Sequence, residues 1–331
     1  MVLAKAAGEL ARTQRRRGEF DAAERTLRAA LERVRASGDG AALAEVHAGV
    51  ASLVADRAFY GTMDPKEARK TLDEALATAR RSGNRQALAA SIDAAAWYDY
   101  AGVLFNGGSY DPSRRGFQEA LAHYEAVGDL SGQAMNLFQI GLTYEQEGKK
   151  NEARAHYQRS AALAERADDP IALSYPIRHL GFFFAEEGNL DEALRYERRC
   201  AFLRIRGGLT RNVPHAYIAI GDLELQKGES GRARIYLTDA LEIAREQHSD
   251  SGALDAHMFL GKVDERDNQR DSAVRHYQEA LALAEKMKRN VDIKDACERL
   301  ARVYEQLGDR SKAQLYRQRA AQAEQLIKAK G

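Results

Sequence analysis

The chain has few of the residues that interrupt helices or crosslink a fold. Only five of its 331 residues are proline, and because proline disrupts helix interiors, so few are typical of a mainly helical chain. The two cysteines, Cys200 and Cys297, lie far apart in the sequence. Both fall on packing positions of the repeat described below, so we expect buried free thiols and a reducing, cytoplasmic location.

An excess of charge of one sign is also lacking. The 50 lysine and arginine residues balance 49 aspartate and glutamate residues, which leaves a net charge of +1. Such a balance argues against a dominant nucleic-acid or membrane field. There is no apolar run of about 18 residues, so we expect no membrane span. Neither nucleic acid nor membrane is therefore an expected partner.

Signatures of catalysis are missing as well. The chain has no HExxH, no GxSxG, no phosphate-binding loop and no CxxC. Residues 105–110 read as a turn and lack the lysine and hydroxyl residue of a phosphate loop. We therefore predict a protein that is not an enzyme and needs no cofactor.

What the chain does have is a small residue at a fixed period. The first three of these positions are 45 residues apart and the rest are 40 apart. They are Ala23, Ala68, Ser113, Ala153, Ala193, Ala233, Ala273 and Ala313. Another small residue follows each of them seven positions later. A period of this length marks stacked supersecondary units, and here it predicts an all-α array of about eight antiparallel helix pairs.

The unit is clearest between residues 134 and 168. Apolar residues recur at helical spacing up to Tyr144, a break follows at Gly148, and a second helix starts before Ala153. Gly141 on the first helix pairs with Ala153 on the second, and the same separation recurs in later repeats. Glycine inside a helix costs about 1 kcal/mol relative to alanine. Its presence therefore indicates that the two helix axes come close together at this point.

This pattern resembles the tetratricopeptide repeat family. The matching segments are Trp97-x-x-Tyr100-Ala101, Leu137-x-x-Ile140-Gly141-x-x-Tyr144 and Ile177-x-x-Leu180-Gly181-x-x-Phe184. The 40-residue period resembles the long-helix subtype of that family. The resemblance implies one right-handed superhelical solenoid over residues 1–331, whose ligands usually lie on the concave face formed by the first helices. The expected repeats are 1–37, 38–83, 84–130, 131–169, 170–210, 211–250, 251–290 and 291–331.

The exposed positions of each first helix should lie between its packing residues. In repeats three to five these positions are mainly aromatic and aliphatic, whereas in repeats six to eight they carry mixed charge. Exposed apolar patches usually mark interaction sites. The predicted partner-binding residues are Tyr98, Phe105, Phe138, Leu142, Tyr175, Arg178, His179, Phe182 and Asp222. The alternative is that Phe138, Leu142 and Phe182 pack between adjacent first helices.

Two further features bear on the prediction. His179, His215 and Asp222 are residue types that hold metals, but histidines on such faces are more often ordinary polar residues, so we predict no metal site. Extra residues relative to the period fall at 59–63 and at 83–91, where we expect longer loops.

Three functions remain open from the sequence. The first is a scaffold or sensor that binds a peptide or a partner's helix in the concave groove. The second is the sensory part of a larger bacterial regulator that binds a small effector. The third is a helical-repeat enzyme with a central pocket. Homo-oligomers through the terminal repeats are compatible with all three.

Overall fold

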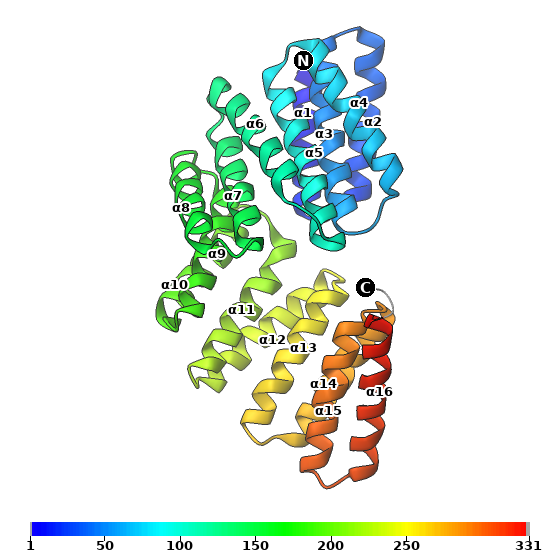
Figure 1. The fold of residues 1–331 in the computed structure, drawn as a ribbon, viewed down its shortest axis with the longest axis vertical. Coiled ribbons are helices and arrows are strands. Elements are labelled where there is room, and N and C mark those ends of the chain that lie inside the picture. The colour runs from blue at the N-terminus through cyan, green and yellow to red at the C-terminus, as the bar shows by residue number, and fades with distance from the viewer. Residues whose placement is uncertain (1, 329–331) are drawn as a thin grey trace. The chain divides into compact units, whose positions relative to one another are not determined.

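The computed structural model describes residues 2–328, in which 16 α-helices and one short 3-10 helix occur and no strand is present (Figure 1). The first eight helices are α1 (Val2–Arg16), α2 (Phe20–Ser37), α3 (Gly40–Phe59), α4 (Pro65–Ser82), α5 (Arg85–Asn106), α6 (Asp111–Val127), α7 (Leu130–Gln146) and α8 (Lys150–Arg166). The others are α9 (Pro170–Glu186), α10 (Leu190–Arg206), η1 (Thr210–Asn212), α11 (Val213–Gln226), α12 (Ser230–Glu246), α13 (Asp250–Arg266), α14 (Arg270–Lys286), α15 (Asn290–Gln306) and α16 (Arg310–Lys328).

The chain divides into two compact units. Unit 1 comprises residues 1–180 and 202–210, and unit 2 comprises residues 181–201 and 211–331. Consecutive helices pack as pairs within each unit, from α1 with α2 to α7 with α8 in unit 1 and from α11 with α12 to α15 with α16 in unit 2. The all-α, paired-helix prediction is confirmed. That all repeats form one continuous solenoid stays a prediction.

The first helices of unit 1 also pack on one another. Helix α1 contacts α3, α3 contacts α5, and α5 approaches α7. We call the side of unit 1 formed by α1, α3, α5, α7 and residues 170–180 of α9 the first-helix face. Burial lowers the pKa of Arg16 at the end of α1, and the charges of Asp169 and Tyr175 act to raise it. This interaction indicates that the end of α1 lies near the start of α9.

The periodic small residues are buried as predicted. All eight are between 0% and 1% exposed. The glycines opposite them are equally restricted, since a Cβ atom on Gly141 would lie 2.6 Å from the ring of Tyr157, and one on Gly221 would lie 2.6 Å from Leu237. These closest partners lie one helical turn beyond the small residues that the sequence pattern pairs with the two glycines. The helices therefore interlock by seating a large side chain over the glycine.

A residue with left-handed backbone conformation recurs every 20 positions from Gly128 to Gly308. Helices α7 and α8, for example, have 17 residues each, and a left-handed residue lies in the short turn that follows each of them. Glycine adopts this conformation without a steric cost. Four of the turns use another residue, with φ between 48° and 58°: Asp168, His248, Asn268 and Lys288.

The extra residues in repeats two and three mostly lengthen helices, which corrects the expectation of long loops. Helices α3 and α5 have 20 and 22 residues. Residues 83–91 contain no long loop, because α4 ends at Ser82 and α5 begins at Arg85. Phe105 belongs to α5, and the turn is confined to residues 107–110.

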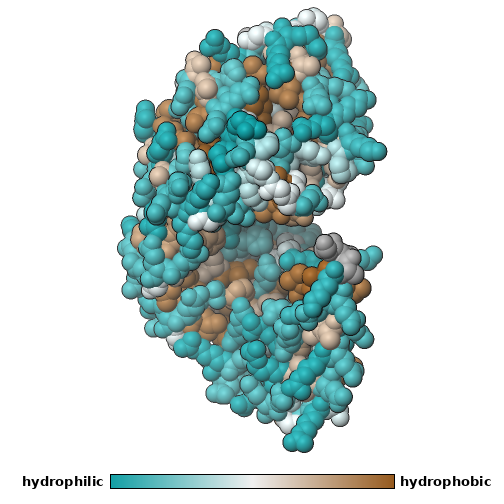
Figure 2. Space-filling model, in the orientation of Figure 1, coloured by the Kyte–Doolittle hydropathy of each residue, from teal (hydrophilic) through white to brown (hydrophobic). Residues whose placement is uncertain are grey.

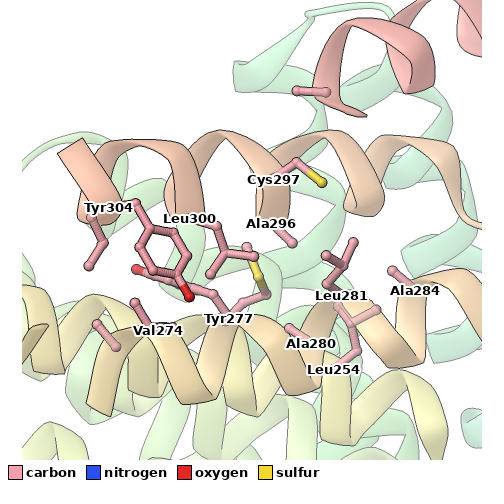
Figure 3. Close-up of a cluster of buried hydrophobic side chains, with 14 of the residues drawn as sticks. Leu254, Val274, Tyr277, Ala280, Leu281, Ala284, Ala296, Cys297, Leu300 and Tyr304 are labelled. Atoms are coloured by element: carbon pink, nitrogen blue, oxygen red, sulfur yellow. The ribbon is translucent and has the colours of Figure 1, made fainter. Parts of the chain in front are cut away.

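Both cysteines are buried and no disulfide joins them, as predicted. Cys297 lies in the hydrophobic cluster of α13–α16 with Tyr277 and Leu300 (Figure 3). On the face drawn in Figure 2, the surface is mostly hydrophilic and hydrophobic residues form small groups. None of the helices in residues 2–328 is both long and apolar enough to cross a membrane.

Candidate functional site

The long helix α5 supplies two of the predicted binding residues. Tyr98 is half-buried, donates its hydroxyl to the carbonyl oxygen of Pro65 at 3.1 Å, and lies under the guanidinium of Arg69. Phe105 is 62% exposed, and its ring centroid is 5.6 Å from that of Phe59. Tyr98 is therefore held in place by α4, whereas Phe105 is accessible at the end of its helix.

Four rings from three helices meet at the centre of the predicted site. Phe138 of α7 lies 5.6 Å from Tyr157 of α8, and 5.4 Å and 5.2 Å from Tyr175 and His179 of α9, measured between ring centroids. The centroids of Tyr157 and His179 are 5.1 Å apart. We call these four residues the α7–α9 aromatic cluster. The rings meet because Phe138 and Tyr157 lie on the sides of α7 and α8 that face α9, and Tyr175 and His179 lie on the side of α9 that faces back toward them.

The predicted exposure of Phe138 and Leu142 is wrong. Phe138 is 4% exposed and Leu142 is 7% exposed. Phe138 packs against rings of α8 and α9, as the alternative interpretation held, and Leu142 is buried as well. Tyr175 and His179 stay half-buried, so the accessible edge of the cluster is on α9.

A carboxylate fixes the orientation of the cluster. Glu145 of α7 accepts the hydroxyl of Tyr157 and lies 2.8 Å from Nδ1 of His179. Burial acts to raise the pKa of Glu145, but the hydrogen bonds and the charge of His179 lower it below its usual value. The ionised carboxylate therefore positions both rings from one point.

The remaining predicted residues fall in different surroundings. Arg178 of α9 is half-buried, with its Nε atom enclosed. Phe182 and Asp222 belong to unit 2, so they are described apart from the residues above. Phe182 is half-buried, and Asp222 accepts a hydrogen bond of 2.9 Å from Gln226.

The first helices of unit 2 carry charged groups, as their sequence indicates. His215 of α11 lies 3.8 Å from Asp255 of α13, and burial raises the pKa of Asp255 to about 6. His257 of α13 is 2.9 Å from His276 of α14 between their Nδ1 atoms. Within residues 2–328, no group of three or more histidine, cysteine, aspartate or glutamate side chains is arranged to hold a metal ion.

The sequence interpretation missed a polar pair on the first-helix face. Burial raises the pKa of Asp93 on α5, a hydrogen bond with Gln139 of α7 acts to lower it, and the resulting pKa is about 7. Oδ1 of Asp93 and Oε1 of Gln139 are both buried without a hydrogen-bond partner. The sequence contains a feature that points to this pair, because Asp93 is an acidic residue inside the mainly apolar run 87–97.

Comparisons with known proteins agree with this architecture. Sequence models described as tetratricopeptide repeat match residues 6–50, 92–166, 212–286 and 296–326. No curated protein sequence matches the chain.

Several solved structures share the fold at low sequence identity. The apo form of the quorum sensor NprR from B. thuringiensis is 13% identical with a TM-score of 0.65, covering 97% of this chain and 87% of that one. A Rap protein complexed with competence and sporulation factor is 13% identical with a TM-score of 0.62, covering 100% and 98%. A signal transduction ATPase with a tetratricopeptide repeat sensor, from Pyrococcus horikoshii, is 15% identical with a TM-score of 0.57, covering 87% and 44%.

Proposed function

Because the chain belongs to the tetratricopeptide repeat family, we propose that it is a non-catalytic sensor or scaffold that binds a peptide or a partner's helix on the first-helix face of unit 1. Helical repeats of this kind are typically interaction scaffolds. Their stacked units present an extended surface that one ligand contacts at several successive helices.

The observation that carries this proposal is the α7–α9 aromatic cluster. Two of its rings are fixed by Glu145, while Tyr175 and His179 keep part of their surface accessible. Rigid aromatic side chains and arginine concentrate binding energy at interfaces. Arg178 lies on α9 next to His179, so aromatic groups and a cationic group occur on one helix.

The fold comparisons support a sensor. The quorum sensor NprR and the Rap protein complexed with its factor match nearly the full length of this chain. Both similarities concern the fold. The peptide selection described next is designed to identify the ligand of this chain.

A peptide-display selection on the immobilised chain, followed by titration of the enriched peptides, tests the proposal. Tyr175→Ala and Arg178→Ala should each weaken binding by about tenfold or more, as expected for interface anchors. Glu152→Ala on the exposed surface of α8 is the matched control and should change neither affinity nor melting temperature. Thermal melts of each variant separate a loss of binding from a loss of folding.

Binding that survives both α9 variants but is abolished by Lys262→Ala or Arg299→Ala would place the recognition surface in unit 2 and refute the proposal. Failure to enrich any peptide would also count against it.

A second candidate is the sensor region of a larger regulator. It is favoured by the similarity to the Pyrococcus horikoshii ATPase, of which this fold spans 44%. The same titration with small effectors in place of peptides distinguishes the two functions.

A further inference from the structure

The polar pair on the first-helix face has hydrogen-bonding capacity that the protein does not use. Gln139 is 6% exposed, yet its Oε1 has no partner. Oδ1 of Asp93 on the facing helix is likewise buried and unpartnered. Asn136, one turn before Gln139, is fully buried and has an unpartnered Oδ1. Residues three apart share one side of a helix, so α5 and α7 together present three unfilled acceptors.

Unfilled buried acceptors are costly. A buried polar atom without a partner costs about 1–3 kcal/mol, and more when it is charged. A fold that retains such atoms normally satisfies them with water or a ligand. What they require is a donor, because all three are oxygen atoms.

The charges around Asp93 decide the kind of donor. The charged groups that act on it are Arg15 of α1, which lowers its pKa, and Asp56 of α3, which raises it. These two already form a pair, with Nε and Nη2 of Arg15 each 2.9 Å from Oδ2 of Asp56. The buried phenol of Tyr124 on α6 also lies near Asp93, and both burial and the charge of Asp93 raise the pKa of Tyr124. An ionised Asp93 therefore leaves one negative charge uncompensated.

We propose that Asp93, Gln139 and Asn136 bind a primary ammonium group of the ligand. An ammonium has three N–H donors and one positive charge, which matches the three unfilled acceptors and the one uncompensated carboxylate. The inference rests on the proposed function, since the ammonium belongs to the same peptide, either as its free amino terminus or as a lysine side chain. Burial raises the pKa of Asp93, so a carboxyl that is protonated before binding should release its proton to solvent when the ammonium binds.

The test compares each enriched peptide with its N-acetylated form, and separately with a form in which norleucine replaces lysine. Removing the ammonium that occupies the site should weaken binding to the parent chain by about tenfold or more, the value of one charge-assisted hydrogen bond. The same change should cost less than about twofold in Asp93→Asn, because the carboxylate is then absent. Whichever peptide form shows the effect identifies the source of the ammonium.

Asp99→Asn is the matched control. Asp99 lies on the same helix but is bonded to Arg69 at 2.7 Å, so this variant should keep the full dependence on the ammonium. If both peptide changes cost the same in the parent and in Asp93→Asn, the inference is overturned while the proposed function stands.

A second measurement keeps the inference testable if no peptide binds and the proposed function fails. Methylammonium chloride should then raise the melting temperature of the parent more than tetramethylammonium chloride, which has no N–H donor, at equal ionic strength. This difference should vanish in Asp93→Asn and persist in Asp99→Asn. Equal shifts from the two salts in the parent would overturn the inference, and would identify the three acceptors as sites for water only.

Discussion

Replacing Gly141 with alanine tests how the helix pairs interlock. The new Cβ would lie 2.6 Å and 2.8 Å from ring atoms of Tyr157 and 3.3 Å from Cβ of His156. Tyr157 is fully buried, and its hydroxyl is held by Glu145, so its ring cannot swing away. Overpacking of this kind typically costs about 1–3 kcal/mol.

The opposing effect is helix propensity. Alanine is favoured over glycine by about 1 kcal/mol in a helix interior. Gly102→Ala on α5 isolates that gain, because Gly102 is exposed and a Cβ there would meet no atom within 4 Å. The propensity gain is common to both variants, so the difference between their free energies of unfolding, about 1–3 kcal/mol, reports the packing cost alone.

Urea-induced unfolding followed by Trp97 fluorescence provides the assay. Trp97 is the single tryptophan of the chain and packs inside unit 1, where both glycines lie. Gly102→Ala should raise the unfolding midpoint and Gly141→Ala should lower it relative to Gly102→Ala. If both variants are stabilised equally, the close approach of α7 and α8 at Gly141 is refuted.

The turn backbone and the buried acid give two other predictions. Lys288→Gly should stabilise the chain by about 1 kcal/mol and Gly308→Ala should destabilise it by about 1–2 kcal/mol, because both positions have positive φ. If the melting temperatures of the two variants do not change in opposite directions, this prediction is contradicted. Asp93 has a folded pKa of about 7 against an ordinary value of 3.8, so its contribution to the free energy of unfolding is most favourable below pH 3.8 and becomes less favourable as the pH rises to about 7, by about 4 kcal/mol. Asp93→Asn should therefore match the parent near pH 4 and exceed it in urea midpoint at pH 8, whereas parallel pH profiles would show that Asp93 is solvated.

Much of the fold could be predicted because its constraints are local. Small residues at positions such as Ala153 and Ala233 are required wherever two helix axes approach, and their period appears directly in the sequence. The turn glycines are similarly visible, since Gly148 and Gly188 have the left-handed conformation that glycine adopts without a steric cost. The lengths of α3 and α5 were not predictable in this way, because added residues can extend a helix as easily as a loop.

The candidate site was predictable only in part. Helical spacing correctly assigned residues to the first helices, but it did not distinguish an inward position from one covered by the next helix. Phe138, for example, packs against Tyr175 and His179 of α9, a contact between helices that are separated in the sequence by the whole of α8. Asp93 was missed because its significance depends on Gln139 and Arg15, which lie on two other helices. Exposure and electrostatics are set by such tertiary neighbours, whereas spacing reports one helix at a time.

The regular spacing of left-handed turns has a consequence for engineering the chain. A cut from Gly148 to Gly188, which runs from one turn to the second turn after it, removes two consecutive helices, α8 and α9, and leaves every remaining helix with a neighbour of the correct polarity and register. A cut from Gly148 to Asp168, the very next turn, would join two helices that must both run in the same direction, and the small residues would no longer meet their large partners. Shortened or lengthened versions of the array should therefore be built in steps of two turns, with the junction placed at a glycine.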